Sequence, residues 1–275
     1  MTALPAPRVP LADGRSIPQL GFGTYKVPAD ATADLVVEAL RIGYRHVDTA
    51  TLYGNEAEVG DGIRRSGLDR DDVFVTTKVW NDDHGFDEAL RAFDASAARL
   101  GLDEVDLYLI HWPIPSRDRY VDTWRALVRL REEGRARSIG VSNFSPAHIE
   151  RIAEATGVWP VIDQVELHPR FPQRDLQRWN DAHGIVTEAW APLARGGLLD
   201  DPALAEIARR HGRTPAQVVI RWHLDRGLVL FPKSTSAARL RENADVFDFS
   251  LDDADRAVIA RLETGERTGR DPDLD

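Results

Sequence analysis

A chain of 275 residues with 43% hydrophobic composition can bury a large core, and α/β barrels of this length commonly form one domain, so we expect a single domain over residues 1–275. The net charge of −10 is spread without long runs of one sign, which argues against nucleic acid or an anionic membrane as the main partner. The absence of cysteine excludes disulfides, cysteine nucleophiles and thiolate metal sites.

The first residues of the chain, 1–7, are neither basic nor followed by an apolar segment. No apolar run approaches the ~18–20 residues that a membrane helix needs. The sequence therefore predicts a cytoplasmic protein without a membrane partner, and we expect a monomer. The scattered histidines lack metal-binding spacing, so we expect no metal site.

Taken in chain order, the pattern begins with a hairpin and continues as strands alternating with helices. The dipeptide Asp13-Gly14, flanked by residues 9–12 and 15–18, predicts a short β-hairpin. Short β-rich runs follow near residues 20–23, 45–48, 73–78, 106–110, 137–141, 161–165, 185–190 and 227–231. Amphipathic helices are predicted near residues 30–42, 56–66, 87–100, 119–133, 146–155, 173–183, 202–211, 215–225 and 252–262.

Eight strands alternating with helices predict a (β/α)₈ TIM barrel with a short N-terminal β-hairpin, and a doubly wound open sheet is the main rival. Polar and aromatic residues fall at or just past the ends of the predicted strands: Asp48, Lys78, His111, Ser142, Asn143, Gln164, Trp190 and Lys233. In a barrel these ends meet on one face, where active sites of this fold lie. The Gly21-Phe-Gly23 and Gly60-Asp-Gly62 segments lack the complete dinucleotide-binding fingerprint of the rival fold.

Lysine is rare in this chain, which draws attention to Lys78. Only three of the 35 basic residues are lysine, namely Lys26, Lys78 and Lys233. Lysines that persist in an arginine-rich sequence are candidates for functions that a bulky, permanently charged guanidinium cannot perform.

The residues around Lys78 have the composition of a proton-donating site. Tyrosine has an ordinary pKa of about 10, and a nearby ammonium group lowers that value by favouring the phenolate. Tyr53 is therefore predicted to be a general acid whose pKa Lys78 lowers, with Asp48 holding Lys78 in place. His111 can orient the reacting oxygen and help to relay the proton.

Each of these side chains also has a purely structural explanation. Asp48 can cap the following loop, Tyr53 can form part of an amphipathic wall, and Lys78 and His111 can be satisfied polar groups at strand ends. Four titratable groups gathered on one barrel face are harder to explain in this way, so we favour a functional cluster.

Four segments resemble the aldo-keto reductase superfamily. They are Gly43-Tyr-Arg-His-Val-Asp-Thr-Ala-Thr-Leu-Tyr-Gly-Asn-Glu56, Asp106-Leu-Tyr-Leu-Ile-His-Trp-Pro113, Ile139-Gly-Val-Ser-Asn-Phe144 and the stretch from Phe231 to Asn243. Such motifs run in order over most of the chain, which looks closest to the bacterial 2,5-diketo-D-gluconate reductase branch. The resemblance implies NADPH-dependent reduction of aldehydes and ketones, including dicarbonyls and keto-sugars such as 2,5-diketo-D-gluconate. A glutamate at the position of His111 marks family members that reduce carbon–carbon double bonds, so His111 favours carbonyl chemistry.

The resemblance also implies the positions that contact NADPH or NADP⁺. Ser142, Asn143 and Gln164 match the residues that hold the nicotinamide carboxamide, and Trp190 matches an aromatic that stacks on the nicotinamide ring. Lys233, Ser234 and Arg239 match contacts to the adenosine 2′-phosphate, which favours NADPH over NADH. The full expected set is Gly23, Thr24, Asp48, Ser142, Asn143, Gln164, Trp190, Ala191, Pro192, Leu193, Phe231, Lys233, Ser234, Thr235, Arg239, Glu242 and Asn243.

Two local features bear on specificity. Ala191 and Ala194 stand in the expected pyrophosphate loop where Ser and Gly are more usual. Tyr25, Trp80, His111 and Trp112 match the walls around the substrate carbonyl, and the short loop over residues 114–120 predicts an open mouth that admits several small carbonyl compounds. The polar tail over residues 265–275 either lies over that mouth or is loose.

Two alternatives remain open at this point. One is a non-catalytic nucleotide-binding or structural member of the same fold, although all four residues of the cluster are present. The other is a barrel enzyme of different chemistry, such as an isomerase or hydrolase, which would carry a different acid/base pair or a glycine-rich phosphate loop. His168 is expected to be structural rather than catalytic.

Overall fold

In the computed structural model, residue 4 and residues 6–274 are described, and the outermost residues of the expected domain, 1–3 and 275, lie outside that part together with residue 5. The described chain begins with an antiparallel hairpin of β1 (Arg8–Pro10) and β2 (Ser16–Pro18). Leu11 and Ile17 of this hairpin are buried among Phe74, Val161 and other residues at the amino ends of the barrel strands. The predicted hairpin is confirmed, and it plugs this end of the barrel.

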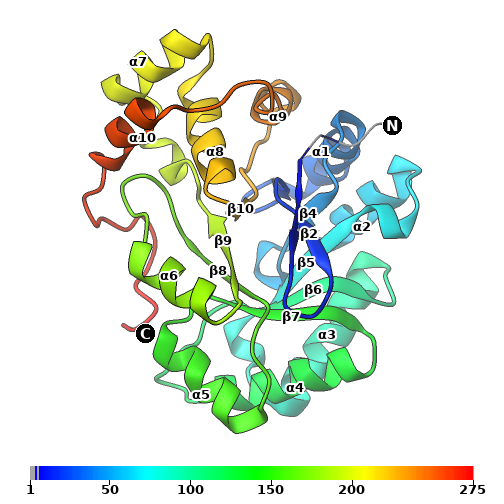
Figure 1. The fold of residues 1–275 in the computed structure, drawn as a ribbon. Helices are drawn as coiled ribbons and strands as arrows, with labels where there is room; N and C mark the ends of the chain where they lie inside the picture. The colour runs from blue at the N-terminus through cyan, green and yellow to red at the C-terminus, as the bar shows by residue number, and fades with distance from the viewer. Residues whose placement is uncertain (1–3, 5, 275) are drawn as a thin grey trace.

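Eight parallel strands form the sheet, and each pairs with its neighbour along the chain (Figure 1). They are β3 (Phe22–Gly23), β4 (His46–Asp48), β5 (Phe74–Val79), β6 (Val105–Ile110), β7 (Ala136–Ser142), β8 (Ile162–Glu166), β9 (Val186–Trp190) and β10 (Val229–Leu230). Parallel bridges from Leu20 to Leu230 and from Gly23 to Lys233 join the two outer strands. Because the first and last strands are joined, the sheet is a closed barrel and the open-sheet rival is excluded.

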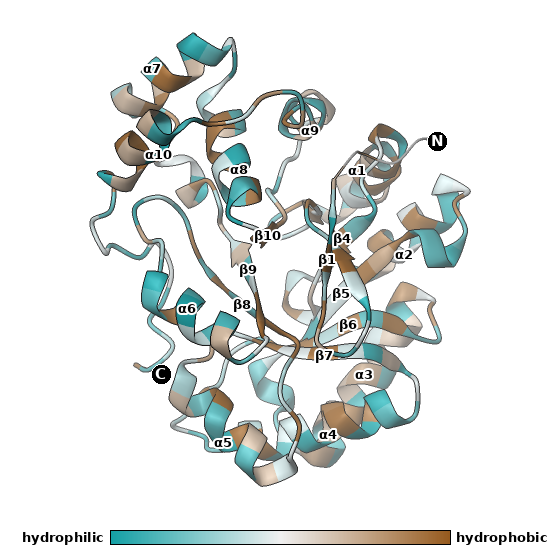
Figure 2. Ribbon diagram, viewed as in Figure 1, coloured by the Kyte–Doolittle hydropathy of each residue, from teal (hydrophilic) through white to brown (hydrophobic). Residues whose placement is uncertain are grey.

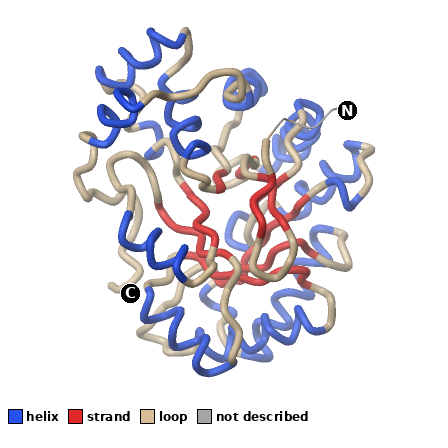
Figure 3. Tube along the Cα trace, in the orientation of Figure 1, coloured by secondary structure: helices blue, strands red, loops and turns tan. Residues whose placement is uncertain are grey.

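Helices surround the strands, as the blue outer ring and red centre of Figure 3 show. Their bounds are α1 (Ala29–Ile42), α2 (Glu56–Ser66), α3 (Phe86–Leu100), α4 (Tyr120–Glu132), α5 (Pro146–Thr156), α6 (Arg174–Ala182), α7 (Pro202–His211), α8 (Pro215–Asp225), α9 (Ala237–Ala244) and α10 (Asp253–Ala260). Short 3₁₀ turns lie at η1 (Thr51–Tyr53), η2 (Arg70–Asp72), η3 (Asn81–Asp83) and η4 (Ala194–Gly196).

All nine predicted helices are confirmed within about two residues of their bounds. The sequence did not lead us to predict α9, an eight-residue helix that buries Leu240, Asn243 and Ala244. Local signals set other helix ends. At α8, Thr214 Oγ1 accepts a hydrogen bond from Gln217 N while Gln217 Oε1 accepts one from Thr214 N. This reciprocal capping box fixes the start of α8.

The core has two layers, one inside the barrel and one between the strands and the helices. Figure 2 shows pale to brown strands at the centre and many teal residues on the helices around them. Gly60 and Gly62 belong to α2 and serve this packing. A Cβ at Gly60 would lie 1.9 Å from Leu100 O, and one at Gly62 would lie 2.6 Å from Val36 Cβ. These glycines therefore allow close approach of α2 to α3 and α1.

Candidate active site

Asp48, Lys78, Tyr53 and His111 meet at the carboxyl end of the barrel. Asp48 ends β4, Lys78 lies in β5, His111 follows β6, and Tyr53 ends the 3₁₀ turn η1. Lys78 Nζ lies 2.8 Å from each carboxylate oxygen of Asp48 and 2.8 Å from Thr49 O. The same Nζ lies 3.4 Å from the Tyr53 hydroxyl. The structure thus brings together all four residues that the sequence singled out.

The Tyr53 hydroxyl faces Lys78, while its ring packs 5.0 Å from Tyr25 and 5.8 Å from the ring of His111. Burial raises the pKa of the phenol well above its ordinary value, and the negative charge of Asp48 adds to this shift. The pKa of Tyr53 is therefore raised overall and not lowered as expected, because burial and the charge of Asp48 outweigh the tendency of Lys78 to favour the phenolate. Tyr53 therefore keeps its proton, as a proton donor must.

His111 is a neutral imidazole in this environment. Burial, followed by the positive charge of Lys78, holds the pKa of His111 well below its ordinary value. The ring packs edge-on to Trp80 with centroids 5.1 Å apart, and its Nδ1 has no hydrogen-bond partner within the described chain. A neutral imidazole can donate one N–H to a carbonyl oxygen without competing with Tyr53 for the proton.

Asn143 and Ser142 are fixed by hydrogen bonds beside this cluster. Asn143 has a left-handed φ of 63°, which asparagine tolerates better than most residues. Its Nδ2 donates to His111 O at 2.9 Å, and its Oδ1 accepts from Trp190 Nε1 at 2.8 Å. Ser142 Oγ donates to Gln164 O at 2.7 Å. Asn143 thereby links the loop of His111 to the ring of Trp190.

Gln164 lies between the carboxyl groups of Asp48 and Glu188. Its Nε2 donates to Asp48 Oδ2 at 3.0 Å and to Glu188 Oε2 at 2.9 Å. Both amide hydrogens are therefore used, and a turned-over amide would place its oxygen against Asp48 Oδ2, which Lys78 also contacts. The side-chain carbonyl oxygen of Gln164, Oε1, remains the group that can accept a hydrogen bond from a ligand.

Glu188 is a buried carboxyl group that the sequence reading missed. Burial, followed by the charge of Asp48, raises the pKa of Glu188 to about 8. Its Oε1 has no hydrogen-bond partner in the described chain and lies 3.8 Å from His46 Nε2. A signal was available, because Glu188 is two residues before Trp190 on one strand and so shares its face of the sheet.

The expected pyrophosphate loop follows β9 directly. Ala191 and Ala194 have φ angles of 49° and 47°, and Arg195 has a φ of 53°. Such angles carry strain for residues with a Cβ, which accounts for glycine being more usual at Ala194. Pro192 is buried and Leu193 half-buried, while Arg195 is exposed.

The expected 2′-phosphate contacts lie at the start of α9. Lys233 and Arg239 are exposed, and neither forms an ion pair with a carboxylate among the described residues. Ser234 is buried and accepts a hydrogen bond from Ser236 N at 3.0 Å, which shapes the turn between them. An exposed cation without a carboxylate partner keeps its charge available to attract an anion.

The other expected cofactor positions surround this end of the barrel. Gly23 must be glycine, since a Cβ there would lie 2.7 Å from Phe231 O. Thr24 Oγ1 donates to Asp48 O at 3.0 Å. Glu242 accepts a hydrogen bond from Thr214 Oγ1 at 2.7 Å. The remaining positions differ in exposure: Asn243 and Phe231 are buried, and Thr235 is exposed.

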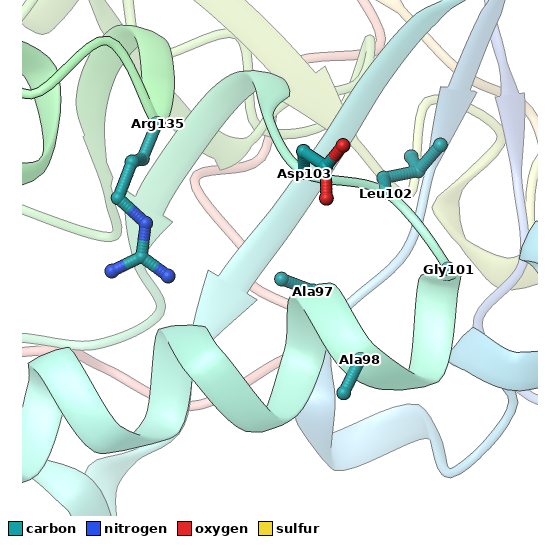
Figure 4. Close-up of a pocket in the computed structure, with 6 residues that line it drawn as sticks. All are labelled: Ala97, Ala98, Gly101, Leu102, Asp103 and Arg135. Carbon is teal, nitrogen blue, oxygen red and sulfur yellow. The ribbon is translucent and has the colours of Figure 1, made fainter.

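The expected substrate walls stand around His111. Tyr25 is 42% exposed, whereas Trp80 and Trp112 are half-buried. This arrangement leaves aromatic surface at the mouth beside Tyr53 and His111. A different hollow, lined by Ala97, Ala98, Gly101, Leu102, Asp103 and Arg135, lies where α3 ends and leads into β6 (Figure 4). It is at the amino end of that strand, away from the four clustered residues.

The described residues hold neither a candidate metal site nor a membrane-spanning helix. No group of three His, Asp or Glu side chains there is arranged to hold a metal ion. None of the helices of that part is long and apolar enough to cross a membrane.

A closed parallel barrel with Asp, Lys, Tyr and His clustered at its carboxyl end defines an oxidoreductase of the aldo-keto type. The Aldo/keto reductase family model matches residues 19–264, and the chain belongs to this family. It is 52% identical over 267 residues to an aldo-keto reductase of Mycolicibacterium smegmatis, with 97% of each chain covered. It is 46% identical over 267 residues to the methylglyoxal reductase DkgA of Escherichia coli, with 96% of each covered.

Solved structures agree with this assignment. A variant of Gox0644 in complex with NADPH superimposes with a TM-score of 0.94 at 49% identity, covering 98% of each chain. The family resemblance and the barrel expected from the sequence are thus confirmed.

Proposed function

We propose that this protein reduces aldehydes and ketones to alcohols with NADPH, and that Tyr53 donates the proton. The observation that carries the proposal is the contact of Lys78 Nζ with both Asp48 oxygens and with the Tyr53 hydroxyl. The Escherichia coli relative is named for reduction of methylglyoxal, and Gox0644 is bound to NADPH, which supports the reaction class and the cofactor.

The chemistry divides between the cofactor and the residues of this chain. Bound NADPH would supply the hydride that the carbonyl carbon accepts. His111, as a neutral donor, holds the carbonyl oxygen near the Tyr53 hydroxyl. As negative charge develops on that oxygen, Tyr53 transfers its proton to it, and Lys78 stabilises the resulting phenolate at 3.4 Å. One hydride and one proton convert the carbonyl into an alcohol.

The residues present fit the cofactor. The free carbonyl oxygen of Gln164 can accept the carboxamide N–H, and Trp190, held by Asn143, offers an aromatic face for the nicotinamide. Lys233 and Arg239 are uncompensated cations for the 2′-phosphate, which favours NADPH over NADH. The loop over residues 191–193 would meet the pyrophosphate through its backbone.

We further propose a cytoplasmic monomer in which residues 1–275 form one domain, with a small carbonyl compound rather than nucleic acid as the partner. The net charge of −10 and the continuous core around one barrel support this. No observation favours a non-catalytic member of the fold, because the four clustered residues retain their mutual contacts.

A substrate panel tests the proposed function. Methylglyoxal and other dicarbonyls, aldoses, keto-sugars and aromatic aldehydes would be assayed with NADPH and with NADH by loss of nicotinamide absorbance. We expect turnover of several small carbonyl compounds, with NADPH preferred. The absence of turnover with every carbonyl compound would contradict the proposed reaction, and a strong preference for one bulky substrate would contradict the open mouth.

A further inference from the structure

The C-terminal segment is fastened to the end of β8 through Glu166. Glu166 Oε1 accepts hydrogen bonds from Thr268 N at 2.5 Å and Thr268 Oγ1 at 2.6 Å, and its Oε2 accepts one from Gly269 N at 3.0 Å. Figure 1 shows this last segment in red, running from α10 to the side of α6. We call the group of Glu166, Thr268 and Gly269 the Glu166 latch.

The latch carries a full negative charge in a buried place. Glu166 is 0% exposed, and among the described residues no Lys or Arg pairs with it. Burial alone would raise the pKa of Glu166, but hydrogen bonds from His168, Thr268 and Gly269 outweigh burial and lower the pKa to about 2. The C-terminal segment supplies three of the hydrogen bonds to this carboxylate, so its release would leave His168 as the one side-chain donor among the described residues.

The C-terminal segment packs closely against Trp190 at Gly269. A Cβ added to Gly269 would lie 2.4 Å from Trp190 Cη2 and 3.0 Å from Glu166 Oε2, so only glycine fits without a shift of the ring. At its other end, the Trp190 ring is held by the hydrogen bond of Nε1 to Asn143 Oδ1 at 2.8 Å. The ring is thus fixed at both ends, and one of the two contacts comes from the C-terminal segment.

We propose that Glu166 is a positioning residue, which latches the C-terminal segment against Trp190 and thereby sets how tightly the enzyme binds the nicotinamide half of its cofactor. The inference rests on the proposed function, because it takes Trp190 as the surface on which the nicotinamide stacks. Glu166 acts through Gly269 and Trp190 and touches neither cofactor nor substrate. Loss of the latch frees the Trp190 ring to turn, so ordering it again weakens cofactor binding.

Limited trypsin digestion tests the latch without cofactor. Cleavage after Arg267 and Arg270 reports release of the segment, and intact-mass spectrometry identifies the products. Glu166→Gln places an amide against the Thr268 and Gly269 donors, so we expect cleavage to be at least about tenfold faster than in the wild type. Glu266→Gln is the matched control, since its side chain has no hydrogen bond or ion pair in the described chain and it removes the same charge. Thr268→Val, which removes one donor, serves if Glu166→Gln does not fold.

Fluorescence titration with NADPH tests the action on Trp190. We expect the Kd for NADPH to rise about tenfold in Glu166→Gln and in Gly269→Ala, while single-turnover reduction at saturating NADPH stays within about threefold of wild type. In a Trp190→Phe background, Glu166→Gln should have a smaller effect on Kd. Faster cleavage with unchanged Kd would overturn the proposal, as would unchanged cleavage. If the wild type binds no NADPH, the proposed function fails, and the proposed role of Glu166 in cofactor binding fails with it. The digestion still reports whether the latch exists.

Discussion

Replacing Lys78 with methionine removes the cation from the buried pair at the centre of the site. Lys78 and Asp48 have side-chain exposures of 0% and 1%, and Nζ lies 2.8 Å from both oxygens. The variant would leave the Asp48 carboxylate buried with only Gln164 as donor. Breaking a buried pair from one side costs about 3–5 kcal/mol. At roughly 2–4 °C per kcal/mol, the melting temperature should fall by about 10 °C.

Asp48→Asn and the double variant Lys78→Met/Asp48→Asn complete a double-mutant cycle. This cycle separates the effect of charge from the effect of packing. Asp48→Asn should destabilise the protein by a similar amount, because it leaves the ammonium of Lys78 buried with Thr49 O and the new amide oxygen. The double variant carries neither charge, so its free energy of unfolding should return to within about 2 kcal/mol of wild type. Its activity should nevertheless stay at least about a hundredfold below wild type, because Lys78 no longer stabilises the Tyr53 phenolate.

Urea unfolding followed by tryptophan fluorescence measures these free energies, and NADPH oxidation measures activity. The control is Arg117→Met, which breaks an exposed pair with Asp82 at 3.0 Å, where the side chains are 49% and 72% exposed. That pair should contribute less than about 1 kcal/mol. Additive losses in the double variant, with no recovery of stability, would refute the reasoning.

Two further predictions concern cofactor choice and pH. The double variant Lys233→Met/Arg239→Leu should raise the Kd for NADPH about a hundredfold and leave the Kd for NADH nearly unchanged. Fluorescence titration measures both values. An equal loss of affinity for both cofactors would contradict the assigned 2′-phosphate contacts. The pKa of Glu188 is raised from 4.5 to about 8, so between these pH values the native protein holds a proton that the unfolded chain releases. The free energy of unfolding therefore falls as the pH rises through this range. Glu188→Gln should therefore gain stability over wild type from about pH 5 to about pH 8 in urea unfolding, and a gain independent of pH would refute this.

The sequence predicted the barrel and its functional face because both depend on local pattern. The residues Asp48, Lys78 and His111 follow apolar runs, and the ends of parallel strands in a barrel must lie on one face. Tyr53 joined them through its position in the loop after β4. Such predictions need only strand periodicity and chain order.

Other features depend on contacts between distant segments and had no local signal. Glu166 receives its partners from Thr268 and Gly269, about a hundred positions later in the chain. The pKa of Tyr53 was predicted in the wrong direction, because the sequence does not reveal how strongly burial and the charge of Asp48 raise it. Helix α9 was also not predicted.

The central claim is that Tyr53 supplies the proton to a carbonyl oxygen. Single-turnover oxidation of bound NADPH by methylglyoxal, compared between wild type and Tyr53→Phe, tests it most directly. We predict that Tyr53→Phe binds NADPH with a Kd within about threefold of wild type and reduces the carbonyl at least about a hundredfold more slowly. Reduction by Tyr53→Phe at the wild-type rate would contradict the claim.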